Sequence, residues 1–334
     1  MRKCLSIEDM PFDLPSLAEL ESAAALVQKH MPPTPQYTWP LLNARMGAEV
    51  WVKHENHTPV GAFKIRGGLV YMDDLMRRHP ETRGVVSATR GNHGQSVGYA
   101  AKHYGVAATV VVPLGNSDEK NSAMRAFGVE LVEYGHDFQA ACEHADALAE
   151  SMGLHRMPSF HPLLVRGVGT YAIEFLRLAP EMDTVYVPVG MGSGICGMLA
   201  ARQALGLKTR VVGVVSADAP AYALSFAKGE PVSHAATTIL ADGLACRTPN
   251  NDALSHILKG VDRIVRVTED EVAGAMAALY YDTHNVAEGA AAASLAGALQ
   301  EKERMRGRRI GVILSGANVD STVFSTVISP VISR

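Results

Sequence analysis

The chain has 334 residues, of which 47% are hydrophobic and 19% charged, and its formal net charge is −3. This length allows a large core and predicts two subdomains, whereas the absence of a basic excess argues against nucleic-acid binding. No apolar run approaches the roughly 20 residues that span a bilayer, and acidic residues and Pro11 interrupt the N-terminus before any secretory signal could form. Cys4, Cys142, Cys196 and Cys246 are too far apart for a disulfide framework or a metal motif. We therefore expect a cytoplasmic protein with reduced thiols.

The first informative element is a lysine that follows a strand and a turn. Residues 49–52 read as a strand, a turn with Pro59 and Gly61 follows, and Lys64 stands where a helix would begin. Apolar neighbours and a helix N-terminus both disfavour the ammonium form, so the pKa of Lys64 should fall. A free amine could form a Schiff base with a carbonyl cofactor. Taken alone, the segment favours a solvated lysine at a helix start, and only the other segments of the chain outweigh that interpretation.

Strand and helix patterns then alternate along the chain in two series. The first predicts strands over 84–89, 109–113, 130–134 and 156–159, with helices over 95–104, 118–127 and 138–152. The second predicts strands over 184–189, 210–216, 263–268 and 309–314, with helices over 195–205, 269–281 and 288–304. Such alternation is typical of open α/β units with parallel sheets. Ligands bind such sheets at the strand ends, so we expect a cleft between the two units.

Three predicted strands run into small-residue turns. The turns are SATRGNHG at 87–94, GMGSG at 190–194 and SGAN at 315–318. Where a helix follows, its first backbone N–H groups point at an anion, and glycines let the backbone close around a phosphate, with Ser193 adding a hydroxyl. One glycine-rich turn is weak evidence. Together with the lysine turn, these features predict a phosphate-bearing cofactor.

The order of these blocks resembles the fold-type II pyridoxal 5′-phosphate enzymes, in the serine/threonine dehydratase branch. Matching positions cover nearly the whole chain: Thr34-Pro35, Lys53, Glu55, Phe63 to Gly67, Gly91 to Gly94, Arg166 to Thr170, Glu174, Gly190 to Gly194, Ala241 to Gly243, Ala287 to Gly289 and Ser315 to Asn318. The resemblance implies two open parallel-sheet subdomains, as in the tryptophan synthase β fold, with the cofactor cleft between them. Residues 1–74 and 160–334 would form the large cofactor-binding domain, and residues 75–159 the small domain that closes on the substrate.

The resemblance also implies roles for individual residues. Lys64 would form the Schiff base and later shuttle the α-proton, and Phe63 would stack near one face of the cofactor ring. Asn92 would hydrogen-bond the cofactor 3′-oxygen, and Ser315 would face the pyridine nitrogen. The phosphate would lie in the loop of Gly190, Met191, Gly192, Ser193 and Gly194. The substrate carboxylate would lie in the turn of Thr89, Arg90, Gly91, Asn92 and His93.

Ser315 favours one type of reaction. A hydroxyl, unlike an aspartate, does not enforce a protonated pyridinium, so the cofactor is a weaker electron sink. A poorly stabilised carbanion should expel a β-leaving group, which with a hydroxyl yields a 2-oxo acid and ammonia. The resemblance therefore implies a lyase acting on a β-hydroxy-α-amino acid such as L-threonine or L-serine.

Two residues depart from the family pattern. Ala62 replaces a serine found in many relatives, and Arg90 stands where dehydratases and serine racemases often have a serine. Arginine is a poor proton acceptor, so racemisation is disfavoured. Arg90 could contact a second substrate carboxylate or reshape the pocket, or it could turn outward to a surface acid. These departures leave 3-phenylserine, with room beside Ala62, and 3-hydroxyaspartate, gripped by Arg90, as further candidate substrates.

The remaining expectations concern metal, assembly and alternatives. Asp242 follows a segment without acids, and with Glu288 it is thin evidence for a hard cation, so we predict no essential divalent metal. The chain ends soon after Ser315, which predicts no regulatory domain and a catabolic or specialised enzyme. The family implies a homodimer. Two alternatives remain: a β-replacement synthase of the same fold, which would join a thiol to the substrate, and a catalytically silent pyridoxal-phosphate carrier.

Overall fold

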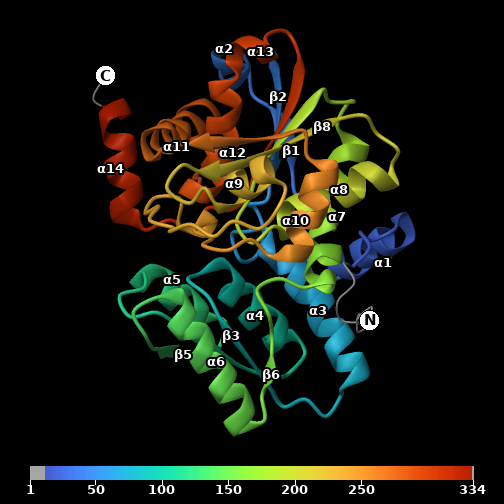
Figure 1. Cartoon of the computed structure of the whole chain (residues 1–334), viewed down its shortest axis with the longest axis vertical. Helices are drawn as coiled ribbons and strands as arrows, with labels where there is room; N and C mark the ends of the chain where they lie inside the picture. Colours follow the sequence, from blue (N-terminus) through green and yellow to red (C-terminus); the bar gives the residue numbers. More distant parts are fainter. Residues whose placement is uncertain (1–11, 333–334) are drawn as a thin grey trace, which may run out of the picture.

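The computed structural model describes residues 12–332, with side chains through residue 329. The N-terminal segment that was considered above as a possible secretory signal, and Cys4 within it, lie outside the described part. The chain forms two sheets, each covered by helices (Figure 1). Within residues 12–332, no helix has the length and apolar character needed to cross a membrane. Cys142, Cys196 and Cys246 carry no disulfide.

The larger sheet has six strands in the order β1-β2-β10-β7-β8-β9. Every neighbouring pair is parallel except β1 with β2. The central strands are rich in valine and isoleucine and almost fully buried, because helices cover both faces. The strands are β1 (Gln36–Thr38), β2 (Glu49–His54), β7 (Thr184–Pro188), β8 (Arg210–Ser216), β9 (Arg263–Val267) and β10 (Arg309–Leu314).

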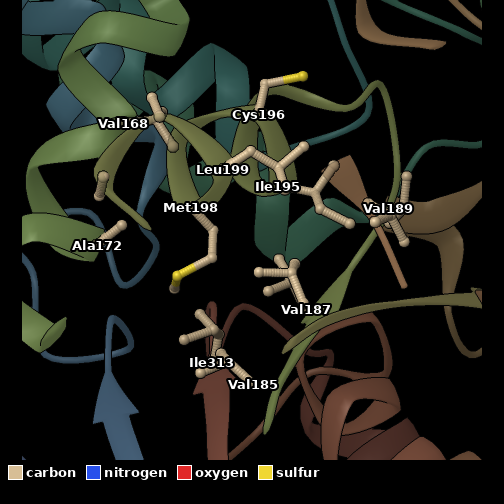
Figure 2. Packing of buried hydrophobic residues seen from close by; sticks show 14 of the residues in the cluster. Val168, Ala172, Val185, Val187, Val189, Ile195, Cys196, Met198, Leu199 and Ile313 are labelled. Carbon is tan, nitrogen blue, oxygen red and sulfur yellow. The ribbon is translucent and has the colours of Figure 1, made fainter. Parts of the chain in front are cut away.

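Two hydrophobic clusters hold helices against the two faces of this sheet. On one face, α7 (Pro162–Leu178), α8 (Ser193–Ala204) and α10 (Asn251–Gly260) pack on Val185, Val187 and Ile313; Figure 2 shows part of this cluster. On the other, α2 (Pro40–Met46), α11 (Glu269–Thr283) and α12 (Gly289–Gln300) pack on Val52 and Val312. Also present are α1 (Leu17–Val27), α9 (Ala221–Lys228), η2 (Asp242–Leu244), α13 (Lys302–Met305) and α14 (Ser321–Ile332).

The smaller sheet has four parallel strands in the order β5-β4-β3-β6. These are β3 (Gly84–Ala88), β4 (Ala107–Val112), β5 (Glu130–Glu133) and β6 (His155–Arg156). On one face α3 (Lys64–Arg78) and α4 (Asn92–His103) pack on Val85 and Val110. On the other, α6 (Phe138–Met152) packs on Val86 and Val111. Helix α5 (Asp118–Ala126) lies between β4 and β5 in the chain.

A close helix crossing fixes the start of α3. Gly167 of α7 lies against the backbone of α3, where a Cβ would be 2.3 Å from the Arg66 carbonyl oxygen. Atoms this close cannot coexist, so only glycine permits the crossing. The position of α3, and with it of Lys64, is therefore set by backbone packing against α7.

A buried ionic network reinforces this crossing. Arg66 donates to Glu55 at 2.7 Å and to Glu174 at 2.8 Å, while Lys53 donates to Glu174 at 2.9 Å. The side chains of Arg66, Lys53 and Glu55 are fully buried, and that of Glu174 is 6% exposed. Two cations and two carboxylates thus balance one another out of contact with water. The network explains why these polar residues stand in otherwise apolar segments of β2, α3 and α7.

Most predicted elements occur close to their expected bounds, and 138–152, 210–216 and 309–314 occur as predicted. The expected helix over 288–304 is divided into α12 and α13, and the expected strand over 156–159 is only the two-residue β6. The strands of the smaller sheet all fall between residues 84 and 156, and those of the larger sheet fall outside that range. The subdomain boundaries at 74 and 160 stay predictions.

Candidate active site

One cavity lies where the carboxyl ends of β3, β7 and β10 meet the start of α3. Its position agrees with the rule that open α/β sheets bind ligands beyond the carboxyl ends of their strands. All residues that the sequence singled out for the site line it: Phe63, Lys64, Thr89, Arg90, Gly91, Asn92, His93, Gly190, Met191, Gly192, Ser193, Gly194 and Ser315. The structure thus brings the four predicted turns together, while the role of each residue stays a prediction.

Lys64 is the first residue of α3 and is partly buried at the cavity wall. Its backbone carbonyl accepts a hydrogen bond from Ser96 Oγ at 2.7 Å, which ties α3 to α4. Burial lowers the pKa of Lys64 to about 8, although the charge of Glu288 opposes the fall. Its Nζ lies 5.1 Å from the centre of the Phe63 ring. At a pKa of about 8, roughly a tenth of the amine is free at pH 7, far more than for an ordinary lysine, which agrees with the expected fall in pKa.

The Gly190–Gly194 turn joins β7 to the N-terminus of α8. Gly192 precedes the helix with φ +99°, a conformation that favours glycine, and a Cβ there would lie 2.6 Å from the Cβ of Ala253. The buried Tyr222 hydroxyl donates to the Met191 carbonyl at 3.0 Å and accepts from the Asn250 backbone N–H at 3.1 Å. The turn is thus held rigidly at a helix N-terminus, where an anion is stabilised.

A second turn, from Thr89 to His93, leads from β3 into α4. Thr89 Oγ1 accepts a hydrogen bond from the Gly91 backbone N–H at 3.1 Å, which orders the turn. His93 is buried, and its Nε2 has no hydrogen-bond partner among the described residues. Burial, with the charges of Lys64 and Arg156, lowers the pKa of His93 to about 3. A neutral imidazole whose Nε2 has no partner among the described residues thus lies in the cavity wall.

Arg90 is exposed in the wall of the same cavity. Its guanidinium forms no salt bridge with any carboxylate in the described part of the chain. The alternative in which Arg90 pairs with a surface acid is therefore not observed, and its charge is available at the cavity.

Asn92 and Ser315 occupy opposite turns at the cavity. Asn92 begins α4, and its Nδ2 donates to Glu288 Oε1 at 2.8 Å. Ser315 is 5% exposed and follows β10, and its carbonyl accepts from the Phe63 backbone N–H at 3.0 Å. The adjacent Ala62 is fully buried in a backbone bridge with Gly316 and does not line the cavity. The structure therefore does not place Ala62 where it would make room for a phenyl ring, and 3-phenylserine as a substrate stays a prediction.

Some cavity residues were not assigned a role from the sequence. Lys120 of α5 donates to Asp242 at 2.5 Å. Burial favours a lower pKa for Lys120, but the charges of Asp242 and Glu288 outweigh it and raise the pKa. Asp242, considered above as a cation ligand, thus faces an ammonium. Lys120 lies in an ordinary polar helix, so no local pattern in the sequence distinguishes it. Three further residues also line the cavity although nothing in the local sequence indicates this: Phe138, Ser159 and Leu244.

Comparisons with known proteins agree with this geometry. Residues 27–316 match the family described as pyridoxal-phosphate dependent enzyme. The chain is 35% identical over 285 residues to an L-threonine ammonia-lyase of Geobacter sulfurreducens, covering 85% of this chain and 71% of that protein. It is 30% identical over 317 residues to an L-threo-3-hydroxyaspartate ammonia-lyase of Saccharomyces cerevisiae, covering 95% of this chain and 97% of that protein.

Solved structures and longer relatives add two facts. The crystal structure of a pyridoxal 5′-phosphate-dependent aspartate racemase is similar with a TM-score of 0.86 at 28% identity, covering 93% of this chain and 98% of that chain. The match to the biosynthetic L-threonine dehydratase of Escherichia coli, at 32% identity, covers 86% of this chain but 56% of that protein. The chain thus spans just over half the length of that biosynthetic relative.

Proposed function

Because this chain belongs to the family of pyridoxal-phosphate dependent enzymes, we propose that it removes water from a β-hydroxy-α-amino acid and releases a 2-oxo acid and ammonia. It is an enzyme of the lyase type, and its cofactor is pyridoxal 5′-phosphate. The observation that carries the proposal is that Lys64, with its lowered pKa, and the Gly190–Gly194 turn line the same cavity.

The residues around the cavity fit this cofactor. The Gly190–Gly194 turn offers backbone N–H groups at the N-terminus of α8, as a phosphate requires, and the Phe63 ring lies beside it, since a Cβ at Gly194 would be 3.6 Å from that ring. Lys64 would hold the aldehyde carbon, Phe63 would face the ring, and Asn92 and Ser315 would contact its edge. When bound, pyridoxal phosphate supplies the electron sink that allows the α-proton and the β-hydroxyl to leave.

The chain's own residues perform the remaining steps. Lys64 Nζ would take the α-proton, because its amine is partly neutral near physiological pH. The backbone N–H groups of the turn from Thr89 to His93 would hold the substrate carboxylate at the start of α4. Arg90 stays protonated and cannot return a proton to the opposite face. This arrangement supports elimination over racemisation.

Arg90 also bears on the substrate. An exposed guanidinium at the cavity with no carboxylate partner in the described residues can pair with a β-carboxylate. The yeast relative is named for 3-hydroxyaspartate and the structural neighbour for aspartate, both of which carry a second carboxylate. Ala62 lies outside the cavity, so the structure gives no support to 3-phenylserine. We therefore favour 3-hydroxyaspartate over L-threonine and L-serine.

A substrate panel tests this proposal. Purified enzyme is given L-threonine, L-serine, 3-phenylserine and the stereoisomers of 3-hydroxyaspartate, and ammonia and 2-oxo acid are measured. In Arg90→Ser, kcat/KM for 3-hydroxyaspartate should fall about 20-fold or more, since a charged hydrogen bond contributes about 1.5–3 kcal/mol, while kcat/KM for L-threonine should change less than about threefold. Equal losses for both substrates would contradict the assignment of Arg90.

The same preparation decides between the remaining alternatives. A thioether formed when a thiol is supplied would indicate a β-replacement synthase, and bound cofactor without ammonia release from any substrate would indicate a silent carrier. We further propose a homodimer located in the cytoplasm, and sedimentation of the purified enzyme would test the dimer.

A further inference from the structure

Glu288 is a buried carboxylate in the cavity wall that the proposed function leaves without a role. It is 5% exposed and directly precedes α12, yet its side chain makes no capping hydrogen bond to that helix. Its Oε1 instead accepts the hydrogen bond from Asn92 Nδ2. A Cβ at Gly316 would lie 2.7 Å from the same oxygen, so only glycine leaves space for the carboxylate. Glu288 is thus directed from the larger sheet towards a residue of α4.

The Asn92 amide is held from both sides. Asn318 Nδ2 donates to Asn92 Oδ1 at 2.8 Å and also to the Val60 carbonyl at 2.9 Å, which fixes the Asn318 amide. Because the Asn318 amide nitrogen is fixed by the Val60 carbonyl and donates to the Asn92 oxygen, the Asn92 nitrogen faces Glu288, whose ionised carboxylate accepts from it. The second N–H of Asn92 remains for a ligand, because Asn92 lines the cavity.

Several charged groups surround the Glu288 carboxylate. Lys120 of α5 and Asp242 of η2 act on the Glu288 carboxylate with opposite signs, and the charge of Glu288 acts on Lys64 of α3. Burial raises the pKa of Glu288 to about 7, with Lys120 opposing the rise and Asp242 adding to it. In return, the charge of Glu288 raises the pKa of Lys64 against the effect of burial. Glu288 and Lys64 line the same cavity, so an ionised Glu288 attracts the proton on Lys64 across it.

We propose that Glu288 is a positioning residue that, with Asn318, holds the Asn92 amide with one N–H towards the cofactor, and whose negative charge retains a proton on the Lys64 nitrogen. The inference rests on the proposed placement of the cofactor beside Lys64 and Asn92 but not on which substrate is used. Glu288 itself contacts no reacting atom in this scheme. Its effect is transmitted through the Asn92 hydrogen bond and through its charge.

The test is a pH titration of the visible absorption band of the bound cofactor in the whole enzyme. Glu288→Gln keeps an acceptor oxygen for Asn92 but removes the charge, so the pH midpoint of the band should fall by about one unit. Glu288→Asp retains the charge and should restore most of the parent midpoint. Asn318→Ala frees the Asn92 oxygen and should weaken cofactor binding about fivefold, the effect of one hydrogen bond, without moving the midpoint.

The outcomes separate this inference from the proposed function. A Glu288→Gln enzyme with the parent's midpoint overturns the role of Glu288 while leaving the lyase assignment intact. A Glu288→Asp enzyme that behaves like Glu288→Gln also overturns it, because the charge would then be irrelevant. If the parent enzyme shows no cofactor band after pyridoxal phosphate is supplied, the proposed function fails and this inference fails with it.

Discussion

Replacing Arg66 by methionine tests whether the buried ionic network fixes the start of α3. Arg66 donates six hydrogen bonds, four of them to the carboxylates of Glu55 and Glu174 and the others to Thr170 and Thr34. Methionine fills similar space but leaves two buried carboxylates with the ammonium of Lys53 alone. Removing one partner of a buried ion pair costs about 3–5 kcal/mol, a large share of the roughly 5–15 kcal/mol that stabilises a typical protein.

The effect of pH provides an independent check on the cause. Burial favours a higher pKa for Glu174, but the hydrogen bonds and charges of Arg66 and Lys53 outweigh it and hold the pKa below its usual value. A depressed pKa in the folded state means that this carboxylate adds stability at neutral pH and that the contribution is lost as the pH falls. In Arg66→Met only Lys53 still opposes the effect of burial, so the pKa of Glu174 should rise and the variant should lose stability as the pH rises. The stability difference between parent and variant should therefore grow from about pH 5.5 to about pH 8.

Urea unfolding at both pH values measures this difference. With a dependence of about 3 kcal/mol per molar urea, the midpoint of Arg66→Met should fall by about 1 M or more near neutral pH. Arg77→Met is the matched control on the same helix, because the Arg77 side chain is 65% exposed in its ion pair with Asp74 and such pairs contribute about 0–1 kcal/mol. Equal shifts for the two variants, or a cost for Arg66→Met that does not change with pH, would refute the reasoning.

Two further predictions concern the cofactor turn and the lysine. Gly192→Ala forces a side chain into the backbone conformation with φ +99° and against Ala253. Cofactor affinity measured by titration should therefore fall about tenfold or more, as expected for at least 1–2 kcal/mol of strain. Gly229→Ala is the control, because Gly229 has φ +79° but open space around it, and it should leave cofactor affinity unchanged. In cofactor-free enzyme, burial holds the pKa of Lys64 near 8, so an amine-reactive reagent should modify Lys64 before the exposed Lys102. The rate of Lys64 modification should increase as the pH rises through 8. Peptide mass spectrometry that finds Lys102 modified first would contradict this.

The sequence predicts the elements whose patterns are local. The strands that become β7, β8 and β10 are apolar runs ending in small-residue turns, and those turns meet at one cavity as expected for open α/β sheets. The sequence analysis predicts neither helices α1, α2, α7, α9, α10 and α14 nor the edge strand β1. In α7 the two glycines of the Arg166 to Thr170 block interrupt the helical pattern, because glycine is typical of turns.

The residues that the sequence did not assign are those defined by long-range contacts. Lys120 meets Asp242 across 122 residues, and Asn92 meets Asn318 across 226. Nothing in the local sequence of either partner specifies such a pairing, because asparagine, lysine and aspartate are also common on exposed surfaces, where they need no partner. Lys64 could be identified because three small-residue turns after other strands accompany it in the sequence, in an order that resembles a known family.

The central claim is that Lys64 is the amine that carries the cofactor. The most direct measurement is reduction of the holoenzyme with borohydride, followed by digestion and peptide mass spectrometry. We predict that the added cofactor mass lies on the peptide containing Lys64 and is absent from Lys64→Ala, which should also release no ammonia from 3-hydroxyaspartate or L-threonine. Cofactor mass on another lysine, or turnover retained in Lys64→Ala, would contradict the account.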